Sequence, residues 1–213
     1  QEVLSLFSDE SLSDVRGTVI QGKDGRKIIP TISLKDLLMD LSLEIIIRAD
    51  LLKAYKEKDF SGFSLINWTI KSSPTYSEIF EYIDNLYRQE IVAFDLETDM
   101  KNQQILCLGL AHSETEGISI PFSEKGESVW TADMEVALWE KIGKFFASPV
   151  KKVAHNACFD VASLWQNNRI WVNNLYFDTM LAWHVLYLPS GAKGFGMKKD
   201  LGFIASMMLN IHA

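Results

Sequence analysis

The stretch at residues 91–100, "IVAFDLETDM", decides how the rest of the chain is interpreted. It has the length and apolar character of a strand, and Asp95 and Glu97 stand at its end with one residue between them. Side chains two positions apart in a strand point to the same face, so the two carboxylates should lie side by side while Phe94 and Leu96 point the other way. Two ionised carboxylates this close repel each other unless a cation lies between them or one is protonated.

Carboxylate oxygens are hard ligands, which favour Mg²⁺ or Mn²⁺ over zinc. No His or Cys stands nearby at zinc-binding spacing. The two acids therefore predict one wall of a magnesium or manganese site. Taken alone, they are also compatible with a solvated strand end.

A second stretch, "VAHNACFD" at residues 153–160, predicts a strand that runs into a helix. Asp160 would lie in the first helical turn, and Asn156 stands four residues earlier, where it could cap the helix and bond a ligand group. Capping alone would explain Asn156 and Asp160. The two stretches together, in this order, favour a metal-dependent site.

The order of the elements around these stretches predicts an α/β fold. Thr75 and Glu78 have the spacing of a helix capping box. Three strand-like runs with short polar connections predict an antiparallel meander, and they are followed by helix, strand, helix, strand. This is the order of a ribonuclease H-like fold, with a mixed sheet and helices on both faces. The three strand-like runs are residues 90–98, 104–112 and 117–122. The helix, strand, helix and strand-to-helix stretches that follow are residues 131–148, 150–156, 157–168 and 174–189, and a last helix is expected within residues 196–209.

"VAFDLET" resembles the first motif, and "HNACFD" the second, of the DEDD superfamily of 3′–5′ exonucleases. The resemblance covers residues 76–213 and is greatest to the proofreading domain of family A DNA polymerases. It implies that Asp95, Glu97 and Asp160 are catalytic and hold two Mg²⁺ or Mn²⁺ ions. The expected reaction is hydrolysis of single-stranded DNA from its 3′ end to nucleoside 5′-monophosphates.

The same resemblance implies roles for four further residues. Thr98 and Asn156 match positions that contact the terminal nucleotide or orient the site. Asp178, in "YFDTMLAWHVL", matches a position that supports the site without binding metal, and His155 stands beside Asn156. His155 also fits a hydrogen-bonded core histidine. The family further implies a polymerase domain, in the same or another chain, as a partner.

The family's third motif, a Tyr followed four positions later by a fourth Asp, is missing. Tyr176 and Tyr187 are followed at that distance by Met180 and Gly191. We therefore expect the chain to be truncated before this motif and to be weakly active or inactive alone. The alternative is a non-catalytic DNA-binding or polymerase-associated scaffold with a degenerate exonuclease fold.

Residues 1–72 are expected to form a separate small α/β segment, and residues 73–213 the exonuclease domain. Residues 17–31 predict two strands around the turn "GKDG", and a helical stretch follows. Ser, Gly and Pro within residues 58–75 indicate a linker.

Residues 16–57 are similar to the end of an iron–sulfur type uracil-DNA glycosylase. The matching residues are Pro30, Thr31, Leu37, Leu38, Asp50, Leu51, Lys53 and Ala54. That family's His-Pro pair is replaced by Ser33 and Leu34, and its cluster cysteines are missing. The segment is therefore interpreted as an inactive remnant or as an unrelated α/β extension.

Composition limits the remaining classes of function. The 213 residues are 47% hydrophobic with mean hydropathy near zero and a net charge of −7. No stretch has the length and apolar character of a membrane span, and the first 20 residues do not resemble a signal peptide. We expect no membrane partner and a cytoplasmic protein of a bacterium or a virus-infected cell. Because the chain is acidic, we expect it to bind nucleic acid only at a local site, where metal ions contact the phosphates.

Overall fold

The computed structural model describes residues 3–63, 67–187 and 198–209. The chain divides into two compact units, which we call the terminal unit (Gln1–Ile66 with Trp183–Ala213) and the sheet unit (Asn67–Ala182). The division into domains at residue 72 stays a prediction. Among the described residues, no helix is both long enough and apolar enough to cross a membrane.

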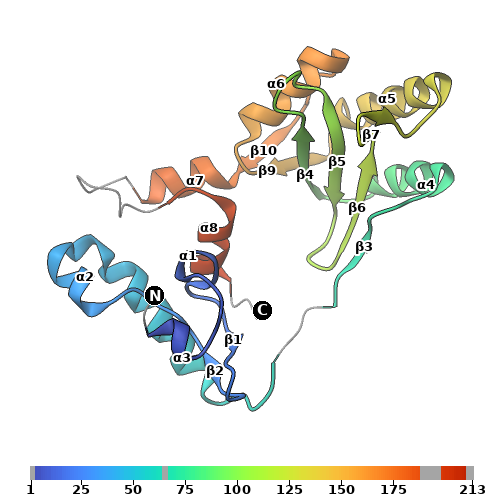
Figure 1. Ribbon diagram of the computed structural model, residues 1–213. Coiled ribbons are helices and arrows are strands. Elements are labelled where there is room, and N and C mark those ends of the chain that lie inside the picture. The colour runs from blue at the N-terminus through green and yellow to red at the C-terminus, as the bar shows by residue number, and fades with distance from the viewer. Residues whose placement is uncertain (1–2, 64–66, 188–197, 210–213) are drawn as a thin grey trace. The chain divides into compact units, whose positions relative to one another are not determined.

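The terminal unit is built from short elements. A short hairpin, β1 with β2, is antiparallel as the sequence predicted around the "GKDG" turn. Short helices and the longer α3 accompany it, and α8 follows later in the chain (Figure 1). The bounds are η1 Leu4–Leu6, α1 Leu12–Val15, β1 Ile20–Gln21, β2 Lys27–Ile28, α2 Leu34–Met39, η2 Leu41–Leu43, α3 Glu44–Glu57 and α8 Leu201–Met208.

A buried charged cluster holds the terminal unit together. Arg16 donates to Asp50 Oδ1 at 2.8 Å, and Thr31 donates to the other oxygen of Asp50 at 2.6 Å. Lys53 donates to the backbone oxygen of Gly17 at 2.8 Å. Thr31, Asp50 and Lys53 are three of the residues that resemble a glycosylase, and here they make internal contacts. The glycosylase resemblance itself stays a prediction.

The sheet unit contains one six-stranded mixed sheet with helices beside it. The bounds are β3 Thr69–Lys71, α4 Tyr76–Leu86, β4 Ile91–Thr98, β5 Ile105–Ala111, β6 Glu116–Pro121, β7 Ser123–Glu124, β8 Glu127–Ser128, α5 Ala132–Phe146, β9 Lys151–Ala154, α6 Ala157–Asn168 and β10 Leu175–Asp178. The helix α7, Thr179–Leu186, begins in the sheet unit and ends in the terminal unit. The helix start at Thr75 is confirmed, because both hydrogen bonds of the capping box with Glu78 are present.

The strand order is β10-β9-β4-β5-β6-β3. The strands β4, β5 and β6 pair antiparallel, as predicted for the meander, whereas β9 is parallel to both β4 and β10. The predicted ribonuclease H-like fold class is therefore confirmed. In this sheet β4 lies between β9 and β5, and these strands can be followed in Figure 1. The short β3, in the segment predicted as a linker, adds a parallel edge strand beside β6.

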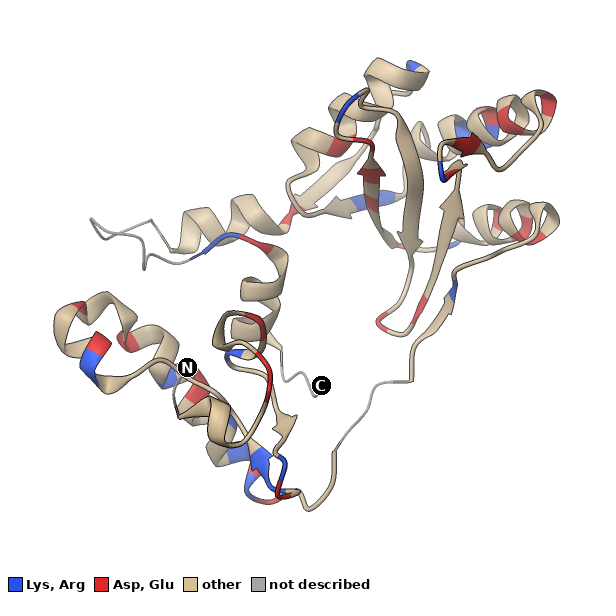
Figure 2. Ribbon diagram, viewed as in Figure 1, with Lys and Arg blue, Asp and Glu red and all other residues tan. Residues whose placement is uncertain are grey.

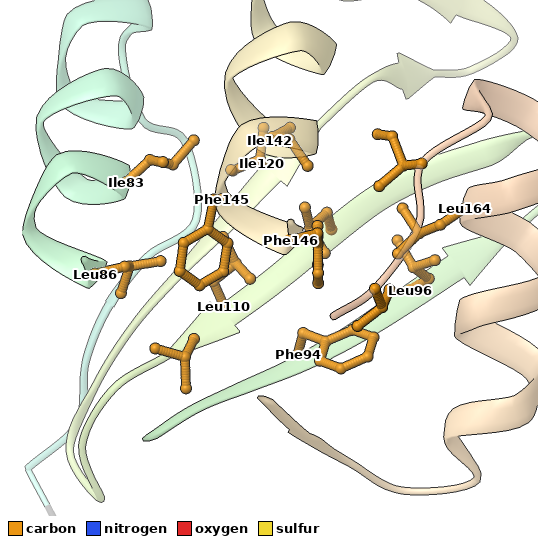
Figure 3. Close-up of a cluster of buried hydrophobic side chains, with 14 of the residues drawn as sticks. Ile83, Leu86, Phe94, Leu96, Leu110, Ile120, Ile142, Phe145, Phe146 and Leu164 are labelled. Carbon is orange, nitrogen blue, oxygen red and sulfur yellow. The ribbon is translucent and has the colours of Figure 1, made fainter. Parts of the chain in front are cut away.

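The core lies on one face of the sheet. Along β4, Val92, Phe94 and Leu96 are buried, and the residues between them are exposed. In Figure 3, Phe94 and Leu96 lie near Phe146 of α5 and Leu164 of α6. The rings of Phe94 and Phe146 are 5.1 Å apart between centroids and nearly perpendicular, a favourable aromatic arrangement. Burial of these alternate residues leaves Asp95 and Glu97 on the opposite face.

Candidate active site

The carboxylates of the first motif lie on the exposed face of β4. Asp95 stands opposite Gly109 of the neighbouring strand, and Glu97 stands opposite Cys107. The prediction that the two acids share a face is confirmed by the alternating burial of β4. Cys107 is therefore a neighbour of Glu97, a relationship that depends on strand register.

The parallel pairing of β4 with β9 brings the second motif to the first. Ala93 pairs with Val153, so the carboxyl ends of the two strands lie together. After β9 the chain turns into α6, where Asp160 is buried with 2% of its surface exposed. Its Oδ1 atom accepts a hydrogen bond from the backbone N–H of Leu96 at 2.9 Å. The first turn of α6 is thus attached between Asp95 and Glu97.

Burial and mutual repulsion disturb the protonation of these acids. Burial raises the pKa of Asp160 to about 7, and the Leu96 N–H opposes this while the Asp95 charge adds to it. The pKa of Asp95 is also raised, first by burial and then by Glu97, with His155 opposing the shift. Burial is the larger cause of both raised pKa values, and the neighbouring carboxylates add to it.

The residue types fit a hard divalent cation. Carboxylate oxygens from a strand end and a helix start are the donors that Mg²⁺ and Mn²⁺ take in proteins. Over the described ranges, no three His, Cys, Asp or Glu side chains converge closely enough to hold a metal ion. The assignment of Asp95, Glu97 and Asp160 as metal ligands therefore stays a proposal, based on their identities and shared location.

Asn156 occupies the N-cap position of α6, as the sequence allowed, but its side chain does not cap the helix. Its side chain makes no capping hydrogen bond, and its backbone is in the left-handed region at φ 60°. Instead, Asp178 accepts hydrogen bonds from the backbone N–H groups of Asn156 at 3.1 Å and Ala157 at 2.8 Å. A carboxylate in this position complements the positive end of a helix. The Asn156 side chain is exposed and is left available for a ligand.

The remaining predicted residues lie close to the same strand ends. His155 Nδ1 and Thr179 Oγ1 are hydrogen-bonded at 2.8 Å, so this half-buried histidine has a protein partner. The sequence did not indicate a role for Thr179, although it directly follows Asp178 in "YFDTMLAWHVL". Thr98 ends β4 after a register irregularity that follows Glu97. Such bulges re-aim side chains near active sites.

The third motif requires an Asp four positions after a Tyr, and the structure describes one of the two positions where it could stand. Tyr176 lies on the edge strand β10, and Met180 stands in α7 where the fourth Asp would be required. Gly191, the corresponding position after Tyr187, lies outside the described residues.

A family model described as "3′–5′ exonuclease" matches residues 70–210 of this chain. No curated protein matches. Among solved structures, the Aedes aegypti Nibbler EXO domain matches with a TM-score of 0.45 and 14% identity, over 64% of this chain and 68% of that one. The catalytic core of RRP6 from Trypanosoma brucei matches with a TM-score of 0.45 and 18% identity, over 82% and 45%.

Escherichia coli RNase D, an exoribonuclease, matches with a TM-score of 0.39 and 15% identity, over 61% of this chain and 31% of that one. The chain thus spans less than half of two of these three structures. All three TM-scores lie below 0.5, so the family assignment rests on the sequence match, which covers more than half of the chain. The motifs on β4 and α6 and this match together show that the chain belongs to the DEDD-type 3′–5′ exonuclease family.

Proposed function

We propose that the chain is the exonuclease part of a DNA polymerase-like protein and removes nucleotides from single-stranded DNA 3′ ends with two Mg²⁺ or Mn²⁺ ions. The proposed products are nucleoside 5′-monophosphates. Asp95, Glu97 and Asp160 are the proposed ligands. The choice of DNA, the role in proofreading and the polymerase partner rest on the family resemblance, and the cytoplasmic location remains a prediction from the sequence.

One observation carries this proposal: the Asp160 carboxylate lies against the backbone of Leu96, between the two acids of β4. A buried acid whose pKa is raised by burial and by a neighbouring acid is costly to ionise without a cation. Perturbed acids of this kind are typical of functional sites. If the only role of Asp160 were to pack against β4, a neutral side chain could fill the same position.

Divalent ions bound by these carboxylates would activate a water molecule and stabilise the departing 3′ oxygen at the terminal phosphodiester. The protein's own contribution is positional. The backbone bond from Leu96 fixes Asp160, and the bonds to Asp178 fix the turn that carries Asn156. The exposed Asn156 side chain and Thr98 are the proposed contacts to the terminal nucleotide.

The test is a paired measurement on the full chain and its Asp95→Ala variant. Calorimetry should show Mn²⁺ binding to the unmodified chain and none to the variant. With 5′-labelled single-stranded DNA and RNA in Mn²⁺, we expect weak stepwise shortening from the 3′ end, and Asp95→Ala should abolish it. Retained Mn²⁺ binding in the variant would place the metal elsewhere and contradict the ligand assignment.

The second candidate function is a non-catalytic scaffold that binds DNA or a polymerase. The sequence fact on its side is that Met180 and Gly191, and not an Asp, stand four positions after Tyr176 and Tyr187. The same experiment separates the two functions. Binding of DNA without Mn²⁺ uptake and without shortening supports the scaffold, whereas Mn²⁺-dependent shortening that Asp95→Ala removes supports the enzyme.

A further inference from the structure

Two exposed tryptophans lie together at the far end of α6. Trp165 is 46% exposed and Trp171 is 63% exposed. Their rings are perpendicular, with centroids 6.2 Å apart. The Arg169 guanidinium carbon lies 5.7 Å from the Trp165 ring centroid, which is cation–π distance. We call Trp165, Arg169 and Trp171 the tryptophan platform.

The backbone of the platform is held by the core. Trp171 stands between Ile170 and Val172, which are both buried in the main hydrophobic cluster of the sheet unit. Arg169 closes α6 in a left-handed conformation at φ 55°, and its backbone N–H donates to the Trp165 oxygen at 3.0 Å. A non-glycine residue is uncommon in this conformation. The fixed backbone turns three large side chains toward solvent.

The segment that carries the platform lacks acids, although the chain as a whole is acidic. The chain has a net charge of −7, yet residues 161–177 contain no Asp or Glu. Arg169 forms no ion pair with any residue that the structure describes. Figure 2 shows the acidic colour of α6 confined to its beginning, where Asp160 lies. The platform therefore combines stacking surfaces with an unneutralised cation, away from acids of its own segment.

We propose that the tryptophan platform binds single-stranded nucleic acid, with bases stacking on Trp165 and Trp171 and Arg169 contacting a phosphate. Aromatic faces accept any base, and a nearby cation meets the backbone. A protein partner would use the aromatic surface but has no need of a segment without acids. The complementarity to a polyanion therefore favours nucleic acid over a second protein surface.

This proposal deepens the proposed exonuclease function and rests on it for the identity of the strand. Arg169 lies nine residues after Asp160 along one helix, which is about 14 Å at the rise of an α-helix. A strand whose 3′ end lies at the carboxylates would reach the platform only when it is several nucleotides long. The platform should therefore affect long substrates and leave the shortest ones unchanged.

The first test measures binding without metal, so that it does not depend on hydrolysis. Fluorescence anisotropy with a labelled twelve-nucleotide oligothymidylate in EDTA compares the full chain with the double variant Trp165→Ala/Trp171→Ala. We expect affinity to fall roughly tenfold or more, because each stacked base contributes about that much. Trp165→Phe/Trp171→Phe should restore part of it, since an aromatic face remains.

The control is Trp68→Ala, which removes an equally exposed tryptophan elsewhere in the sheet unit. It should leave the affinity unchanged. Arg169→Asn provides a separate test of the cation, because Asn tolerates the left-handed backbone. This variant should bind more weakly at low salt, and the slope of log affinity against log salt should decrease by about one.

Equal binding by the double variant and the unmodified chain would overturn the proposal. So would a change from dimer to monomer in the double variant, measured by light scattering, with unchanged oligonucleotide affinity, because the surface would then be an interface between copies. Affinity that falls alike in Trp68→Ala would also overturn it, since the effect would not be local.

Hydrolysis distinguishes failure of this proposal from failure of the exonuclease function. In Mn²⁺, the double variant should cleave a dinucleotide at the unmodified rate and a twelve-nucleotide strand more slowly. If no chain hydrolyses either substrate but binding still requires the two tryptophans, the platform stands and the enzyme proposal falls. If both substrates are cleaved equally by the variant, the enzyme stands and the platform falls.

Discussion

The Asp160 carboxylate and the Leu96 backbone N–H are joined by a hydrogen bond of 2.9 Å across 64 positions of sequence. The bond attaches the start of α6 to the segment of β4 that carries Asp95 and Glu97. It gives Asp160 two separable roles, as a structural acceptor and as a proposed metal ligand.

The first prediction separates these roles with two substitutions. Asp160→Ala leaves the buried Leu96 N–H without its acceptor, whereas Asp160→Asn can keep an oxygen there. We expect the Ala variant to be less stable than the Asn variant by about 1–3 kcal/mol in urea unfolding with EDTA. Both variants should lose metal-dependent hydrolysis. Equal stability of the two variants would show that the backbone bond contributes nothing.

The second prediction concerns the pH dependence of metal binding. Burial raises the pKa of Asp160 to about 7, and a metal ion must displace the proton below that pH. Mn²⁺ affinity should therefore rise up to about tenfold for each step of one in pH, from roughly pH 5.5 toward 7, and level off above about 8. Calorimetry in two buffers of different ionisation enthalpy would also detect the released proton. A flat profile would contradict either the raised pKa of Asp160 or its role as a ligand.

The third prediction tests Asp178, whose carboxylate accepts four backbone N–H groups. They belong to Asn156, Ala157, Met180 and Leu181, at 2.8–3.2 Å. Asp178→Ala should destabilise the chain by about 2 kcal/mol, as for the loss of a strong helix cap. It should also lower kcat, because the turn that carries Asn156 loses its anchor. Thermal unfolding and single-turnover rates measure the two effects.

Asp200→Ala is the matched control for that experiment. Asp200 caps α8 in the terminal unit through one bond, to the N–H of Phe203 at 2.8 Å. Its loss should lower stability without changing kcat. If both variants lower kcat equally, the effect of Asp178 on the site is merely general destabilisation.

The fourth prediction concerns Lys152, which is wholly buried on β9. Its ammonium donates to the Ser148 backbone oxygen at 2.6 Å, and burial lowers its pKa to about 8. Below about pH 8 the charged side chain therefore destabilises the folded state, and stability is regained as pH rises toward the ordinary pKa of 10.5.

Relative to Lys152→Met, the unmodified chain should therefore gain a few kcal/mol between about pH 8 and 10.5, because a pKa lowered by one corresponds to about 1.4 kcal/mol. Urea unfolding at several pH values measures this difference. Lys101→Met, at an exposed position, is the control and should show no such gain. A pH-independent difference between the chain and Lys152→Met would contradict the lowered pKa of Lys152.

Much of the sheet unit could be predicted from local patterns. Alternation along β4 predicted that Phe94 and Leu96 face away from Asp95 and Glu97, because the side-chain period of a strand is two residues. The capping box at Thr75 predicted the start of α4 for an equally local reason. The role of Asn156 could not be predicted this way, because its capping function is taken over by Asp178, 22 residues later.

The sequence by itself determined most strands and helices of the sheet unit and that two acids share one face of a strand, since these depend on contacts within a few residues. It did not determine the short strands β3, β7 and β8. The tertiary structure alone decided that β9 lies parallel to β4, that Asp160 is bonded to Leu96 and that Cys107 lies opposite Glu97. Those relationships depend on strand order and register. Both are set by how the buried faces of distant elements pack together.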